Sequence, residues 1–275
     1  MIPVGPIRDL AHRALSGALD LLFPPRCRVC ETHGCDPICP LCYARLERVS
    51  GPLCHLCGLP FDASTHHGNL CPECRAARRI DRIRSVCHYT GRIRKAIGEL
   101  KYRGHRELVA PLAQVLQEYL SNALDVADTV DPYYTAPPSI GSSQVDLLIP
   151  VPLFATRERE RGFNQAGLLA EELGRLEGLV VASGALVRKR ETPPQVGLSA
   201  IERRVNVRGA FEAVDRAAIR ARTILLLDDV CTTGATLEEC AKTLVRAGAE
   251  RVWAITLARQ HKDWASETLS ATERP

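Results

Sequence analysis

The segment DDVCTTGAT, residues 228–236, joins two adjacent carboxylates to a loop of hydroxyls and small side chains. Backbone N–H groups and hydroxyls at the start of a helix form a cradle for phosphate, because the helix dipole is positive there. Asp228 and Asp229 would repel that phosphate unless they bind the hydroxyls of an attached sugar, or a divalent cation that accompanies it. A ribose phosphate fits both halves of the segment. The loop has neither the Gly and Lys spacing of a P-loop nor the three glycines of a dinucleotide fingerprint.

Two other interpretations of this segment remain open. One is a polar turn from strand to helix, in which Thr236 caps the helix and binds nothing. The other gives Cys231, inside the loop, the role of a nucleophile.

The elements around the segment are those of a parallel α/β sheet. Residues 223–228 form a short apolar run, which is typical of a strand buried on both faces, and residues 251–257 form the next such strand. Residues 237–247 between them have a helical pattern that ends at Gly248. Ligands of open α/β sheets bind at the carboxyl edge of the strands, so residues 228–236 lie where a ligand is expected.

A second strand and helix are expected to complete this edge. Residues 145–152 form another buried strand, and an amphipathic helix is expected over 164–176. The basic stretch between them contains Arg157, Arg159 and Arg161. Such alternating charges also fit a solvated helix face, and for Arg159 that interpretation is equally good.

Eight of the twelve cysteines form four CxxC pairs. Each pair offers two sulfurs to one ion, and Zn²⁺ favours four such ligands in a tetrahedron. The pairs read as an internal repeat, so we expect two zinc sites made of consecutive pairs, namely Cys27, Cys30, Cys39 and Cys42, then Cys54, Cys57, Cys71 and Cys74. A cross-braced arrangement, in which alternate pairs share an ion, remains open. A redox role is the competing chemistry, but the scarcity of apolar residues between the pairs favours a fold built by metal.

The other cysteines fit no pair. Cys87 and Cys240 are expected to be small buried residues. Cys35 is expected to be an ordinary thiol or a substitute ligand.

The composition is that of a globular protein with two domains. The 275 residues are 45% hydrophobic and 25% charged. The first 23 residues predict an amphipathic helix rather than a signal peptide. No apolar run approaches the roughly 20 residues that cross a bilayer. Paired cysteines without an export signal indicate metal ligands in a reducing compartment, so we expect a cytosolic protein.

The charge is concentrated in one segment. Residues 75–106 hold eleven Lys or Arg against Asp81 and Glu99, a balance of +9 in a chain of net charge +4. Such a cluster beside zinc sites predicts salt-sensitive binding of nucleic acid, with Tyr89 and Tyr102 as candidates for stacking on single-stranded DNA. A solvated face remains the alternative.

The segment DDVCTTGAT also closely resembles the phosphoribosyl diphosphate (PRPP) binding motif of type I phosphoribosyltransferases. This resemblance implies that Asp228 and Asp229 hold the ribose 2′ and 3′ hydroxyls and that residues 232–236 hold the 5′-phosphate. The whole motif would line the PRPP site, namely Asp228, Asp229, Val230, Cys231, Thr232, Thr233, Gly234, Ala235 and Thr236. It further implies Mg²⁺ on the diphosphate and a diphosphate-binding loop after the first core strand, for which Arg157 and Arg161 are the candidates.

The rest of the chain is similar to the ComF family of competence-associated phosphoribosyltransferase-like proteins. The motifs are VPL and RGFNQA at 151–166, KYRG at 101–104 and TPPQVGLSAIERRVNVRGAF at 192–211, together with the cysteine pairs. The resemblance implies a type I phosphoribosyltransferase-like parallel sheet flanked by helices, preceded by a double zinc ribbon. The expected boundaries are an amphipathic helix over 1–23, the ribbon over 24–80, the transferase-like domain over 81–260 and a polar tail over 261–275.

Residues within the 192–211 motif are candidates for a segment that closes over the reacting centre in such enzymes, namely Gln195, Arg203 and Asn206. Surface roles are equally open for them. The segment from Asp125 to Gln144 and the tail after Gln260 depart from the family pattern and are expected to be insertions or loops.

Two functions follow as hypotheses. The first is a Mg²⁺-dependent enzyme that transfers the phosphoribosyl group of PRPP to an acceptor with release of pyrophosphate, of the type associated with DNA uptake. The second is a non-catalytic module that binds single-stranded nucleic acid and PRPP. The sequence contains no evident pocket for a nucleobase and no evident general base.

Overall fold

The computed structural model describes residues 24–35, 37–60, 69–71, 74, 80–122, 140–193 and 199–260. Several expectations lie outside these residues, namely those for the helix over 1–23, the tail over 261–275, residues 125–139, Gln195, and Arg75, Arg78 and Arg79. The described residues up to Leu46 form one compact unit, and those from Glu47 onward form another.

The larger unit contains a parallel sheet of four strands in the order β1-β6-β5-β2. The strands are β1 (Arg82–His88), β2 (Leu147–Pro150), β5 (Thr223–Cys231) and β6 (Arg251–Arg259). The expected parallel α/β sheet is therefore confirmed. β5 and β6 extend beyond the expected ranges 223–228 and 251–257, so Asp229 belongs to the strand as Asp228 does.

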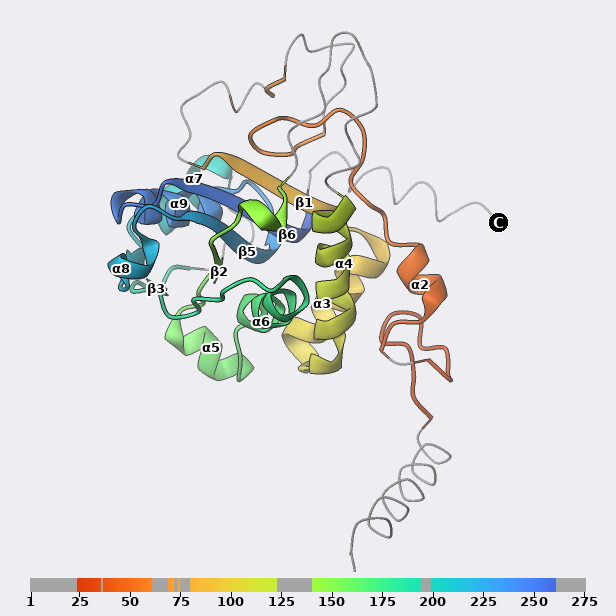
Figure 1. The fold of residues 1–275 in the computed structure, drawn as a ribbon. Coiled ribbons are helices and arrows are strands. Elements are labelled where there is room, and N and C mark those ends of the chain that lie inside the picture. Colours follow the sequence, from red (N-terminus) through yellow and green to blue (C-terminus); the bar gives the residue numbers. More distant parts are fainter. Residues whose placement is uncertain are drawn as a thin grey trace, which may run out of the picture. The chain divides into compact units, whose positions relative to one another are not determined.

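Helices cover both faces of this sheet (Figure 1). One face is covered by α3 (Gly91–Arg103), α4 (Val109–Asn122) and α6 (Gln165–Glu177). The other is covered by α9 (Ala235–Arg246), against which α7 (Ala200–Val207) packs. The remaining elements are α5 (Ala155–Arg161), α8 (Arg216–Ile219), the 3₁₀ turns η2 (Arg106–Leu108) and η4 (Ser142–Gln144), and an antiparallel pair made of β3 (Leu186–Arg188) and β4 (Phe211–Ala213).

The core forms because successive side chains of a strand point to opposite faces of the sheet. Ile224 and Leu226 of β5 belong to one buried cluster with Leu237 and Leu244 of α9. The side chains between them in β5 point to the opposite face, where α6 packs against this strand. Every residue from Ile224 to Leu227 is fully buried. This two-sided burial explains the unbroken apolar run before the acid pair.

The chain from Glu47 to Pro60 lies along the free edge of β1. Val49 donates its N–H to the carbonyl of Val86 at 2.9 Å, and Ile83 donates its N–H to the carbonyl of Leu56 at 2.7 Å. The second cysteine group, Cys54, Cys57, Cys71 and Cys74, is therefore part of the same unit as the sheet.

The smaller unit is organised around the first cysteine group. Its helix α2 (Pro40–Ala44) has Cys39 as its N-cap, and the Sγ of Cys39 accepts a hydrogen bond from the N–H of Cys42 at 3.4 Å. The Sγ of Cys27 accepts one from the N–H of Cys39 at 3.3 Å. In neither unit does a described helix combine the length and the apolar character that crossing a membrane requires.

Candidate functional site

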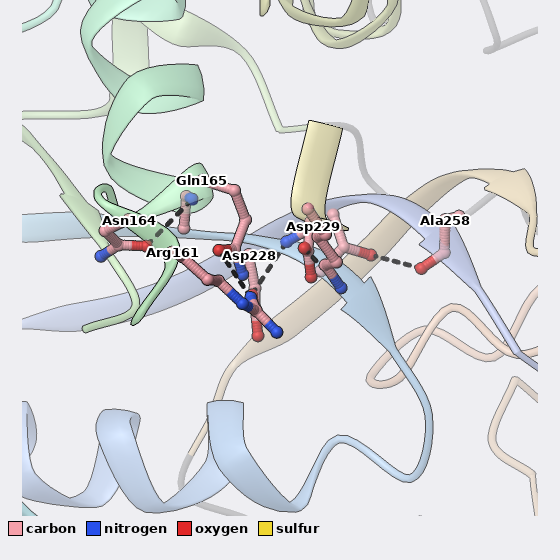
Figure 2. Close-up of polar contacts among 9 residues, drawn as sticks. Arg161, Asn164, Gln165, Asp228, Asp229 and Ala258 are labelled. Atoms are coloured by element: carbon pink, nitrogen blue, oxygen red, sulfur yellow. Dashed lines mark hydrogen bonds and ion pairs between the residues drawn. The ribbon is translucent and has the colours of Figure 1, made fainter. Parts of the chain in front are cut away.

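The two carboxylates stand at the carboxyl edge of β5, as Figure 2 shows. Asp228 is half-buried and Asp229 is buried, with 4% exposure. The Oδ1 of Asp228 accepts a hydrogen bond from the N–H of Asp229 at 2.9 Å. Burial, followed by the negative charge of Asp229, raises the pKa of Asp228 to about 7. A carboxyl group with such a pKa changes its charge near neutral pH.

Asp229 forms an ion pair with Lys101 of α3. The Lys101 Nζ lies 2.6 Å from the Asp229 Oδ2, and the two side chains are 13% and 5% exposed. Burial acts to lower the pKa of Lys101, but the charge of Asp229 and its hydrogen bond outweigh that effect and raise it. The lysine therefore stays charged and compensates one of the two acids.

Lys101 was not predicted as a site residue. It lies within the basic segment 75–106, and its charge alone does not distinguish it from the neighbouring cations. The KYRG motif at 101–104 is the signal that could have separated it, because it places Lys101 in the last turn of α3, before Gly104 ends the helix in a left-handed conformation.

The loop after the acids turns sharply into α9. Gly234 has a φ of +77° and is the N-cap of this helix. Thr236 is therefore inside the first turn and is not the cap, so the structure does not support the capping role considered for it. The hydroxyl of Thr233 accepts a hydrogen bond from the N–H of Ala235 at 3.4 Å. The backbone N–H groups of this turn lie at a positive helix end, as a phosphate cradle requires.

The acids and the loop line one pocket of about 380 Å³. The pocket brings together residues from four parts of the larger unit, namely Tyr89, Lys101, Arg203, Asp228, Asp229, Val230, Cys231, Thr232, Gly234, Ala235, Thr236, Leu237 and Gln260. Of the predicted motif, only Thr233 is not part of this lining. The lining of the pocket thus combines the two acidic groups with the hydroxyls of the loop and the first residues of α9.

The candidate diphosphate ligands lie on α5. Arg157 and Arg161 are half-buried, whereas Arg159 is exposed. The Arg161 Nη1 donates to the Oε1 of Gln165 at 2.9 Å, a contact drawn in Figure 2, and its guanidinium stacks on Tyr102 at 5.6 Å from the ring centroid. Neither Arg157 nor Arg161 is among the residues that line the pocket of the acid pair.

Arg188 of β3 is a further cation near the acids that the sequence did not predict. Burial lowers its pKa most, the charge of Arg157 lowers it further, and the charge of Asp228 raises it. Arg188 therefore lies within electrostatic reach of both Arg157 and Asp228. Like charges gathered in this way favour an anion between them.

Of the described residues of the 192–211 motif, one lines the pocket. Arg203 of α7 lines it, and α7 starts with a capping box in which Ser199 and Glu202 bond each other's backbone. The Nδ2 of Asn206 donates to the carbonyl of Pro193 at 3.0 Å, which is a structural contact.

Of the four cysteines outside the pairs, Cys87, Cys231 and Cys240 are buried in the core. Cys231 is 2% exposed and lines the pocket. Burial raises the pKa of Cys240 well above its usual value and that of Cys87 to about 11. Both are therefore neutral thiols, as expected of small buried residues. Cys35 is half-buried and belongs to neither four-cysteine group.

The eight paired cysteines form two groups made of consecutive pairs, and within each group all four Sγ atoms lie within 4.8 Å of one another. The structure thus groups them as expected and not in the cross-braced way. Zinc–sulfur bonds of about 2.3 Å in a tetrahedron separate the sulfurs by about 3.8 Å. The Cys30–Cys39 and Cys57–Cys71 sulfurs lie 3.7 and 3.6 Å apart, so both groups fit structural zinc.

The basic segment divides between the core and the surface. Arg84 is buried, with 1% exposure, and Lys101 is paired with Asp229, so neither belongs to an open basic face. Tyr89 is half-buried and lines the pocket of the acid pair. Tyr102 is 76% exposed on α3, where Arg94, Lys95 and Arg103 are also exposed, and Arg106 of η2 is exposed as well.

Fold and cysteine groups together define a class of protein in which a phosphoribosyltransferase-like domain follows a double zinc ribbon. Residues 18–75 match the family described as "Double zinc ribbon domain". Residues 160–271 match the family described as "Phosphoribosyl transferase domain". The expected class of fold is thereby confirmed.

Several relatives cover most of the chain. The "DNA utilization protein YhgH" of Escherichia coli O157:H7 is 33% identical over 234 residues, which cover 85% of this chain and 95% of that protein. "Competence protein F" of Haemophilus influenzae is 31% identical over 81% of this chain and 90% of that protein. "Competence protein ComFC" of Bacillus subtilis is 30% identical over 82% of this chain and 85% of that protein. The chain belongs to the ComF family.

Proposed function

We propose that this protein binds PRPP in the pocket of the acid pair and transfers its phosphoribosyl group to an acceptor, releasing pyrophosphate. The observation that carries the proposal is the pocket itself, which Asp228 and Asp229 line together with the loop and the first turn of α9. Carboxylates accept hydrogen bonds from sugar hydroxyls, and the helix end attracts the attached phosphate. The 380 Å³ of the pocket is adequate for a sugar phosphate.

Each part of PRPP has a matching group in this proposal. Asp228 and Asp229 accept the ribose hydroxyls, and Lys101 holds Asp229 in place as a carboxylate. The N–H groups and hydroxyls of residues 232–236 hold the 5′-phosphate. Arg157 and Arg161 attract the diphosphate, which is the group that leaves from C1 of the ribose.

Magnesium accompanies PRPP in this proposal. Mg²⁺ prefers hard oxygen ligands, and Asp228 offers carboxylate oxygens at the pocket while Lys101 occupies the Oδ2 of Asp229. When bound, the ion offsets the charge that develops on the leaving diphosphate. The protein itself supplies position and charge, which is the main requirement of a displacement in which C1 becomes cationic.

A matched pair of variants tests the transfer. Pyrophosphate release from PRPP is measured with a panel of nucleobase, amine and nucleic-acid acceptors. Asp228→Asn together with Asp229→Asn is expected to abolish release. Asp215→Asn, which alters a side chain that caps α8 and leaves a good cap, is expected to release pyrophosphate at the normal rate. Equal rates in the two proteins would refute the assignment of the acid pair.

A second function, binding of single-stranded DNA, is supported by the exposed face of α3. Tyr102 is exposed there, and the same helix carries the exposed cations Arg94, Lys95 and Arg103. Cations attract the phosphates, and an exposed ring offers a platform for an unpaired base. The names of the relatives refer to DNA utilization and competence, which fits such a partner.

Fluorescence anisotropy with single-stranded DNA at two salt concentrations tests this second function. Arg94→Gln with Arg103→Gln is expected to weaken binding, whereas Arg175→Gln on α6 leaves it unchanged. Binding in the wild-type protein is expected to weaken steeply with salt. A wild-type protein that binds no DNA at low salt leaves the PRPP proposal as the only function. We further propose that the protein is cytosolic and that its domains are divided at residues 23, 80 and 260.

A further inference from the structure

Two arginines are almost completely buried between the sheet and the second cysteine group. Arg84 of β1 is 1% exposed, and Arg259 of β6 is 3% exposed. A buried guanidinium is costly unless hydrogen bonds and negative charge compensate it. The groups around the two arginines therefore indicate which negative charge compensates them.

The turn that carries Cys57 is bound to the sheet by three successive carbonyls. That of His55 accepts from the Arg84 Nη2 at 3.2 Å, and that of Leu56 accepts from the N–H of Ile83 at 2.7 Å. The carbonyl of Cys57 accepts from the Arg259 Nη1. The core strands thus hold the metal-binding turn through its backbone, with a cation at each end of the three-residue run.

The charge of the second cysteine group matches the charge of these arginines. Zn²⁺ with four thiolates carries a net charge of −2, and all four cysteines are at most 2% exposed. The first group differs, because its Cys30 is exposed and water can screen its charge.

Arg259 also reaches the pocket of the acid pair through its backbone. Its carbonyl accepts a hydrogen bond from the N–H of Tyr89 at 2.8 Å. The next residue, Gln260, donates its N–H to the carbonyl of Cys231 at 2.9 Å. Tyr89, Cys231 and Gln260 all line the pocket. One residue therefore has its side chain at the metal centre and its backbone at the pocket wall.

We propose that Arg259, assisted by Arg84, is the counter-ion of the second zinc centre and couples zinc at that centre to ligand binding in the adjacent pocket. The first part concerns zinc alone, whereas the coupling rests on the proposed binding of PRPP. Arg259 acts here as a positioning residue: it holds the Cys57 turn, offsets the zinc thiolate charge and fixes the strand end that carries Gln260.

Zinc release from the full chain tests the first part. The number of ions per chain is followed by native mass spectrometry during competition with a chelator. Arg259→Gln is expected to bind zinc at the second centre about 10- to 100-fold more weakly, the usual effect of removing a group that supports metal ligands. The control is Arg251→Gln, which removes an exposed arginine at the start of the same strand and keeps wild-type zinc affinity. A folded Arg259→Gln protein that holds both ions as tightly as the wild type would overturn the proposal.

The wild-type protein tests the coupling without any variant, which matters if Arg259→Gln does not fold. Coupling between two binding sites is reciprocal, so saturation with PRPP and magnesium is expected to raise zinc affinity at one of the two centres by about 5-fold or more. An unchanged zinc affinity in protein that calorimetry shows to be saturated with PRPP would overturn the coupling. Absence of PRPP binding in the same calorimetry would refute the proposed function instead, and the chelator competition would still decide the counter-ion role.

Discussion

Replacing Lys101 by Met is expected to destabilise the protein, because it leaves the carboxylate of Asp229 buried without its cation. At the 2.6 Å that separates Nζ from Oδ2, an effective dielectric constant of about 20 gives an attraction of about 6 kcal/mol. Desolvation of the two charges offsets a large part of this attraction. The side chains are only 13% and 5% exposed, so water screens the remainder weakly. We expect the free energy of unfolding to fall by about 3 kcal/mol.

A double-mutant cycle isolates the ion pair from other effects of the substitution. Urea unfolding is measured at pH 7.5 for Lys101→Met, Asp229→Asn and the two together. The loss in the double variant is expected to be smaller than the sum of the single losses by about 2 kcal/mol. A coupling free energy below about 0.5 kcal/mol, the value for an exposed pair, would refute the burial and the geometry assigned to Lys101.

Three further predictions follow from the same site and from the metal centres. The pKa of Asp228 is about 7 in the folded chain and about 3.9 in the unfolded chain. The unfolded chain therefore loses this proton at lower pH, and the fold is destabilised as the pH rises towards 7 and above. The free energy of unfolding of Asp228→Asn, relative to wild type, should therefore increase by about 2 kcal/mol between pH 5.5 and 8, and no change would contradict the raised pKa. Gly58→Ala should cost about 2 kcal/mol and weaken zinc binding, because the added Cβ would lie 2.6 Å from the carbonyl oxygen of Ile83 at a φ of +64°. Gly51→Ala, at a φ of +91° with open space around it, should leave zinc binding unchanged in the same titration. Removing zinc with a chelator should unfold the described part of the smaller unit, seen as a loss of amide protection over residues 24–46, and retained protection would contradict a fold built by metal.

The sequence predicted those parts of the fold that are encoded locally. The apolar run before Asp228, the small loop and the following helix are contiguous, so their periodicity and residue types identify them together. The paired cysteines are equally local, because a CxxC turn presents two sulfurs by itself. The ends of β5 and β6 were predicted too early, since Asp229 and Arg259 are polar residues that the strands nevertheless include.

The partners of the site residues were not predictable, because they join distant parts of the chain. Arg259 and Cys57 are 202 residues apart, and no local pattern relates them. Lys101 and Arg84 were counted as members of a basic surface, since a charge run carries no information about which members fold inward. Tertiary packing places Lys101 against Asp229 and Arg84 against His55.

Calorimetry of the wild-type protein with PRPP and magnesium tests the central claim most directly. Zinc-loaded, folded protein is expected to bind one PRPP per chain with saturable heat, and ribose 5-phosphate should compete because it presents the same sugar and phosphate. The protein with Asp228→Asn and Asp229→Asn should give no such heat while keeping both zinc ions. A folded wild-type sample that gives no heat at saturating PRPP and magnesium would contradict the claim that the acids and the helix end form a sugar-phosphate site.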